Sequence, residues 1–160
     1  MVREGLVGIG TELGKLQIVR RAPEASLKEV FLSAVGGLPG ADGKDLRGEV
    51  VAEALGYLQE GFGAHYAVQE AASDDAILVG DHAYALAVET IARLDEPRFV
   101  GVASRMIRDG AGEISRGNAV SLSLWTPHLA QLLGIISGED ESRSEERIWA
   151  AIGEVRVAGG

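Results

Sequence analysis

Three histidines are the first residues of this sequence whose type could support chemistry. His65, His82 and His128 lie too far apart in the chain to predict a metal-binding triad, and none belongs to the HExxH pattern of zinc enzymes. We therefore interpret each histidine as a hydrogen-bonded residue on a helix face, and we expect none of them to be catalytic.

A group of three aspartates is the second candidate. The i, i+7 spacing of Asp74 and Asp81 places both on one face of a helix, as paired carboxylates for a hard cation require. Asp74 and Asp75 also follow Ser73 in the first turn of an expected helix, where the macrodipole favours anions. Because Mg²⁺ and Ca²⁺ sites generally use more oxygen ligands, we interpret Asp74 and Asp75 as part of a helix start and keep the three aspartates as candidate metal ligands.

Motifs of the common enzyme classes are missing from the sequence. There is no G-x-S-x-G nucleophile motif, no G-x-x-x-x-G-K-[ST] phosphate loop, and no G-x-G-x-x-G after a strand. The chain also has no cysteine, which excludes disulfides, thiolate zinc sites and a cysteine nucleophile. Hydrolase and nucleotide-dependent activities therefore lose support.

Charge and composition limit the partners. The 160 residues include 24 acidic and 15 basic side chains, so the formal net charge of −9 disfavours nucleic acid as a partner. A hydrophobic content of 46% is ordinary for a globular protein, and the length predicts a single domain over residues 1–160. The first residues do not resemble a targeting signal, so we expect a cytoplasmic location.

The spacing of apolar residues predicts helices along the whole chain, and no segment alternates as a half-buried strand would. Ser26–Glu29 and Ser142–Glu145 have the spacing of capping boxes. The fold is therefore predicted to be an all-α bundle. Its expected helices cover residues 6–16, 27–36, 47–72, 74–94, 97–110, a segment that starts at Thr126–Pro127 and stops at Gly138, and a last one that carries Ile148, Trp149, Ile152 and Val155.

The uncharged segment Gly117–Gly138 is long enough to cross a membrane, but its polar residues would lack partners in lipid. We interpret it as a buried or partner-facing helix and expect no membrane span. Small residues over Gly80–Ala87 add a second surface for close helix approach. Together these two segments predict a dimer at least.

Short motifs in the middle of the chain point to a family. Ala76-Ile-Leu-Val-Gly-Asp81, followed by small and apolar residues, and Ile107-Arg-Asp-Gly-Ala-Gly-Glu113 resemble two consecutive helices of the trans-polyprenyl diphosphate synthases. The resemblance implies an isoprenoid synthase fold, with Asp81 and Glu113 as motif carboxylates. Gly43–Arg47 is similar to the family's diphosphate-binding segment, which implies that Lys44 and Arg47 would hold a diphosphate.

The two aspartate-rich DDxxD clusters that hold Mg²⁺ in this family are missing. The first would fall near His65–Glu70, which has one carboxylate, and the chain ends before the second. The resemblance therefore implies a truncated, non-catalytic subunit that pairs with a catalytic prenyl synthase or with itself, with no cofactor of its own. One alternative is a module that binds an isoprenoid or other apolar ligand in a groove at Leu58, Phe62 and Tyr66. The other is a residual prenyltransferase that uses Mg²⁺ at a reduced carboxylate site.

Overall fold

The structure is a computed structural model that describes residues 25–41, 43, 45–70 and 74–159. Every regular element in these residues is a helix, which confirms the all-α prediction. The segment predicted as a first helix (residues 6–16) and the predicted cap Ser73 lie outside the described residues. The six helices are α2 (Leu27–Gly36), α3 (Arg47–Glu70), α4 (Asp74–Ala92), α5 (Pro97–Ser115), α6 (Leu122–Ser137) and α7 (Glu141–Gly159).

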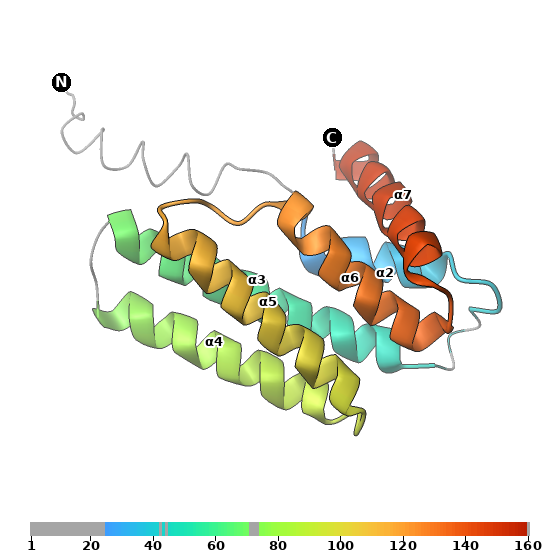
Figure 1. The fold of residues 1–160 in the computed structure, drawn as a ribbon, viewed down its shortest axis with the longest axis horizontal. Coiled ribbons are helices and arrows are strands. Elements are labelled where there is room, and N and C mark those ends of the chain that lie inside the picture. The colour runs from blue at the N-terminus through green and yellow to red at the C-terminus, as the bar shows by residue number, and fades with distance from the viewer. Residues whose placement is uncertain (1–24, 42, 44, 71–73, 160) are drawn as a thin grey trace.

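The helices pack in an order that leaves two of them at the edges of the bundle (Figure 1). Helix α3 contacts α2, α4, α5 and α6, and therefore joins the two halves. Among the described helices, α4 packs against α3 and α5, whereas α7 packs against α2 and α6. Each edge helix therefore keeps one side that no described helix covers.

The helix start predicted at Ser26 is confirmed. Ser26 is the N-cap of α2, and its hydroxyl accepts a hydrogen bond of 3.2 Å from the amide of Glu29. Helix α5 begins at Pro97 as expected but continues past Gly110 to Ser115. Gly110 does not end the helix because it is buried beneath aromatic rings in a helical conformation, and the chain first turns to a positive φ at Gly117.

The predicted start of α6 at Thr126–Pro127 is wrong. Ser121 is the N-cap, and its hydroxyl accepts a hydrogen bond of 3.3 Å from the amide of Leu124. The Thr126 hydroxyl instead donates to the carbonyl of Leu122, at 2.8 Å, inside the helix. Pro127 is therefore an internal residue, and its missing amide removes one helical hydrogen bond near the start of α6.

The predicted capping box at Ser142–Glu145 is also wrong. A carboxylate oxygen of Asp140 accepts a hydrogen bond of 2.8 Å from the amide of Arg143, so Asp140 caps α7. Helix α7 then begins at Glu141, one residue before the predicted cap Ser142, which lies exposed in the first turn. Asp140 is one of the strongest N-cap residues, and it comes two positions earlier than Ser142.

All six helices contribute to the core, including α4 through Ile91 and α7 through Ile148 and Ile152, and half of the residues of α6 are buried. The predicted apolar faces of α3 and α5 are confirmed: Val51, Leu55, Leu58, Phe62, Phe99, Val102, Ala103 and Met106 are all buried. Ile77 and Trp149 were expected on buried faces but are exposed. Helix α4 instead buries the small residues Gly80, Ala83 and Ala87, because α3 approaches it closely. No described helix is long and apolar enough to cross a membrane.

Candidate functional site

Asp81, one of the two motif carboxylates, faces a hollow between α3, α4 and α5. The hollow has a volume of about 430 Å³, and its polar lining includes His65, Asp81 and Ser115. Its apolar walls come from Ile77, Tyr84, Ala111 and Ile114. The second carboxylate, Glu113, is not part of this lining. The two motif carboxylates therefore do not share one pocket.

The polar atoms at this hollow are incompletely paired. The Nε2 atom of His65 lies 3.1 Å from a carboxylate oxygen of Asp81, but the contact is not aligned as a hydrogen bond. The Tyr84 hydroxyl is buried and has no partner among the described residues. Burial, with a smaller contribution from the charge of Asp81, raises the pKa of Tyr84 far above its usual range. Tyr84 therefore stays neutral and can donate a hydrogen bond.

Glu113 is held by its own helix end. Its carboxylate accepts hydrogen bonds from the side chains of Arg116 and Asn118, the latter at 3.1 Å. The bond from Arg116, with that from Asn118, lowers the pKa of Glu113. Asp74 and Asp75 are exposed in the first turn of α4. Within the described residues, no group of three or more histidine or carboxylate side chains is placed to hold a metal ion.

Arg47 was expected to hold a diphosphate together with Lys44, which lies outside the described residues. The Arg47 guanidinium donates to both carboxylate oxygens of Asp45, at 2.8–3.2 Å, and to the carbonyl of Ile136 at 3.2 Å. The hydrogen bond from Arg47 lowers the pKa of Asp45. Asp45 therefore occupies most of the donors that Arg47 uses, and one further hydrogen bond ties the start of α3 to the end of α6.

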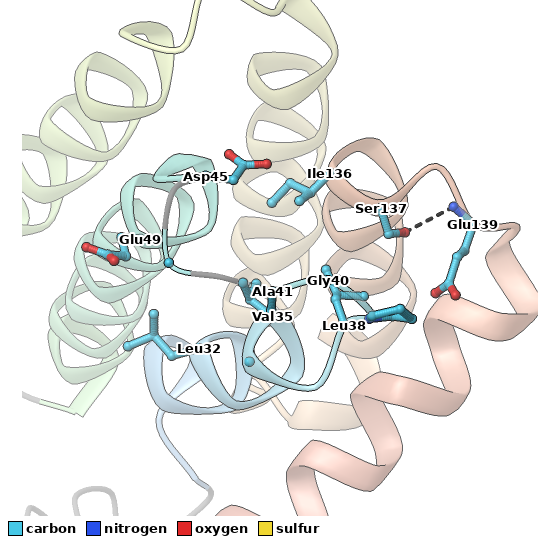
Figure 2. A pocket seen from close by; sticks show the side chains of 13 residues that line it. Leu32, Val35, Leu38, Gly40, Ala41, Asp45, Glu49, Ile136, Ser137 and Glu139 are labelled. Atoms are coloured by element: carbon cyan, nitrogen blue, oxygen red, sulfur yellow. Dashed lines mark hydrogen bonds between the residues drawn. The ribbon is translucent and has the colours of Figure 1, made fainter.

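A larger cavity, which we call the loop pocket, is lined by Asp45 and Ile136, the two residues that accept hydrogen bonds from Arg47 (Figure 2). Its volume is about 470 Å³, within the usual range for small-molecule sites. Its apolar walls include Leu32, Val35, Leu38, Pro39 and Ile136, and its carboxylates are Asp45, Glu49 and Glu139. Glu139 is bound by Arg147 at 2.6 and 2.9 Å, and this guanidinium also donates to the carbonyl of Gly37.

The residues predicted to line an apolar groove belong to different surroundings. Leu58 is fully buried in the core. Phe62 stacks on Trp125 with ring centroids 4.6 Å apart, and it also lines a cavity of about 150 Å³ together with Tyr66. The structure thus brings Phe62 and Tyr66 to one small cavity and places Leu58 outside its lining.

The histidines occupy three different environments. His128 is buried, and its Nε2 atom lies 2.9 Å from a carboxylate oxygen of Asp109, as expected for a hydrogen-bonded residue on a helix face. Hydrogen bonds from Arg108 and, more weakly, from His128 lower the pKa of Asp109. His82 is exposed on α4. The three imidazoles therefore do not form one site.

The segments expected to form a dimer surface are used inside the bundle. Gly80, Ala83 and Ala87 are buried against the neighbouring helix, and α6 buries half of its residues. The exposed apolar surface lies elsewhere. On α7, Trp149 is 47% exposed and Val157 is 83% exposed; on α4, Leu78 is 65% exposed and Val79 is 55% exposed.

The sequence pattern predicts Trp149 on the buried side of α7 with Ile148 and Ile152, but only the two isoleucines are buried. The spacing Trp149, Gly153, Val157 is i, i+4, i+8, which places all three residues on one side of a helix. That side is opposite to the stripe that starts at Ile148, so the signal was present in the sequence. Comparisons of the chain with protein-family models, with curated proteins and with solved structures found no match.

Proposed function

We propose that this protein is a non-catalytic helical subunit whose function is to bind another protein chain. The sequence resemblance suggests that the partner chain is a polyprenyl diphosphate synthase that carries both DDxxD clusters. The observation that carries the proposal is the apolar outer face of α7, which we define as Trp149, Ala150, Gly153 and Val157. All four residues are exposed.

The composition of the α7 face is that of an interface centre. Trp149 is an exposed indole on a regular helix, and tryptophan is enriched among the residues that dominate binding energies. A Cβ atom on Gly153 would have no neighbour within 4 Å, so the backbone is open to close approach there. Val157 extends the face by one more turn, giving an apolar strip about 12 Å long at 1.5 Å per residue.

The test is to mix the full chain with such a synthase and to measure both binding and the chain length of the prenyl products. We expect a complex, a changed product length, and a blue shift of Trp149 fluorescence as the indole becomes buried. Trp149→Phe, which leaves Trp125 as the one remaining tryptophan, identifies the source of the shift.

The interface variant is Trp149→Asp, and its matched control is Leu46→Asp, an exposed apolar residue just before α3. We expect Trp149→Asp to weaken binding by at least about tenfold, because it removes a central aromatic contact and buries a charge. Leu46→Asp should leave binding unchanged. Equal affinities of the wild-type chain and Trp149→Asp, or no effect of the subunit on synthase products, would contradict the proposal.

The loop pocket favours a second function, which is the binding of an apolar ligand. Its volume and its walls at Leu32, Val35 and Leu38 suit a prenyl chain or a similar apolar group. Titration with a fluorescent farnesyl probe should then saturate, and Leu32→Glu should reduce the affinity. Leu78→Glu, on α4, is the control. Absence of saturation, or equal effects of the two variants, would rule this function out.

A further inference from the structure

A small cavity lies where the described part of the chain begins. It is the cavity of about 150 Å³ formed by the starts of α2 and α6 and by α3, and Ala25 and Leu27 are part of its lining. The amide of Leu27 donates a hydrogen bond of 2.8 Å to Oε1 of Gln59, which also lines the cavity. This bond fixes the start of α2 on α3. The chain therefore enters the described structure at the edge of this cavity, which we call the entry cavity.

The walls of the entry cavity are mainly apolar and partly open. Phe62 and Trp125 are buried, whereas Tyr66 and Val120 are only half-buried. Gly63 also lines the cavity and is exposed, and a Cβ atom there would meet nothing within 4 Å. The volume of about 150 Å³ is smaller than the roughly 300–1,000 Å³ of small-molecule sites. The entry cavity therefore suits a few aliphatic side chains better than a whole ligand.

Residues 1–24, which lie outside the described residues, carry side chains of this kind. Their apolar stripe is spaced three, four and three residues apart, so a helix over residues 6–16 presents it on one side: Leu6, Ile9, Leu13 and Leu16. At 1.5 Å per residue the stripe is about 15 Å long, and the α3 wall from Gln59 to Tyr66 is about 10 Å long. The stripe is therefore long enough to cover the cavity.

This expected helix needs a surface on which to pack. It has 11 residues, and three of them are glycines. An isolated helix of this length is marginal in water, and each internal glycine weakens it further. Burial of its apolar side against the bundle would supply the missing stability.

The connection and the charge of the segment favour the cavity of the same chain. Residues 17–24 join the stripe to Ala25 and span at most about 30 Å, so the stripe stays near the entry cavity at a high effective concentration. Residues 1–24 carry four basic and three acidic side chains, whereas residues 25–160 carry 11 basic and 21 acidic ones. A second copy of the acidic bundle would be repelled, but the segment would not.

We propose that residues 6–16 form a helix whose apolar stripe packs on the entry cavity of the same chain, with its aliphatic side chains beside Tyr66 and Val120. The surface at Phe62 and Tyr66, one of the expected sites for an isoprenoid, is then covered by the chain itself. The proposal uses neither the α7 face nor the loop pocket, so it holds or fails independently of both proposed functions.

Cysteine pairs test this contact in the full chain, because the sequence contains no cysteine. Leu13→Cys with Gly63→Cys joins the apolar side of the segment to the exposed edge of the cavity, and Ile9→Cys with Gly63→Cys covers a shift of one helical turn. Under mild oxidation we expect at least one of these pairs to form a disulfide within one chain. The disulfide is measured as the loss of two free thiols without a dimer on a non-reducing gel.

Two control pairs separate docking from mere proximity. Thr11→Cys with Gly63→Cys uses the opposite side of the expected helix, and Leu13→Cys with Gly153→Cys uses a glycine of α7 that is also exposed and open. Both pairs should form the disulfide at least about fivefold more slowly.

Single variants give a second measurement that needs no cross-link. Leu13→Asp places a charge on the apolar stripe and should lower the melting temperature by about 4 °C or more, because the aliphatic side chain no longer fills the cavity. Thr11→Asp introduces the same charge on the opposite side and should leave the melting temperature unchanged.

Three results would overturn the inference. They are equal rates for the Ile9, Leu13 and Thr11 pairs with Gly63, a Gly153 pair that reacts as fast as the Gly63 pairs, and equal melting temperatures of Leu13→Asp and Thr11→Asp. A disulfide that forms only between chains, seen as a dimer on the gel, would also overturn it, because the segment of a second copy would then occupy the cavity.

Discussion

Tyr84 of α4 packs so closely on Gly61 of α3 that a Cβ atom on Gly61 would lie 2.4 Å from ring atom Cε1 of Tyr84. The reverse contact lies one turn away, where a Cβ atom on Gly80 would be 2.5 Å from the His65 ring. The two rings stack on each other, with centroids 5.0 Å apart and planes inclined by 20°. Each helix thus provides a glycine that receives an aromatic ring from the other.

Gly61→Ala tests this packing. The added methyl group would collide with the Tyr84 ring and would also lie 3.2 Å from the backbone carbonyl oxygen of Gly80, which cannot move without shifting α4. We expect the free energy of unfolding to fall by about 1–3 kcal/mol, as for other overpacked core positions. Urea or thermal unfolding of the two proteins measures the difference.

Gly63→Ala is the control on the same helix. A Cβ atom on Gly63 would meet nothing within 4 Å, so the substitution adds helix propensity without a clash. It should raise the free energy of unfolding by about 0.5–1 kcal/mol. A Gly61→Ala protein as stable as Gly63→Ala would contradict the close packing of α3 and α4.

Much of this helical arrangement could be predicted from the sequence, because apolar spacing and capping residues are local signals. Ser26 caps α2 as its spacing with Glu29 indicates, and the buried stripes of α3 and α5 follow the 3.6-residue period. The buried face of α4 could be read in this way only in part: Ile91 is buried as its apolar spacing indicates, whereas Ile77 is exposed. Its contacts use Gly80, Ala83 and Ala87, and small residues carry little hydrophobic signal.

The candidate site was less predictable, because side-chain pairing depends on neighbours that are distant in sequence. The glycine and charge pattern around Arg47 resembles a diphosphate-binding segment, yet Asp45 and the carbonyl of Ile136 occupy its guanidinium. Glu113 matches a family motif, yet it binds Arg116 and Asn118. A local pattern can identify a residue type, whereas the partner of each charge is decided by the packing of the helices.

The capping of α7 gives a second prediction. Asp140→Ala removes the oxygen that accepts the Arg143 amide, so we expect a loss of about 1 kcal/mol in the free energy of unfolding. Ser142→Ala should change stability little, because Ser142 is exposed in the first turn and α7 begins before it. Equilibrium unfolding of both variants decides between the two caps. A larger loss for Ser142→Ala would restore the capping box predicted from the sequence.

The pairing of Asp109 with Arg108 and His128 makes part of the stability depend on pH. Its pKa is lowered in the folded protein, so the ionised carboxylate stabilises the fold above the unfolded pKa of about 3.9, and this contribution is lost as the pH falls through the folded pKa. We therefore expect Asp109→Asn to lower the free energy of unfolding by about 1 kcal/mol near neutral pH. The loss is small because the carboxylate is partly exposed to solvent.

Unfolding measured at neutral pH and again below pH about 3 provides the comparison. The difference in free energy of unfolding between the wild-type chain and Asp109→Asn should become smaller as the pH falls. Asp95→Asn, at an exposed turn between α4 and α5, is the control and should show no such trend. If this difference in free energy of unfolding stayed constant with pH, the charge of Asp109 would not stabilise the folded protein.

A substitution at Gly153 should affect the stability of the chain and its proposed binding role in opposite directions. Because a Cβ atom there would meet nothing within 4 Å, Gly153→Arg should leave the fold intact and, through better helix propensity, stabilise it by up to about 1 kcal/mol. The same long side chain would stand on the α7 face between Trp149 and Val157 and keep a partner helix from approaching. We therefore expect a higher melting temperature together with weaker synthase binding. Unchanged binding in a stabilised Gly153→Arg chain would exclude the α7 face as the docking surface.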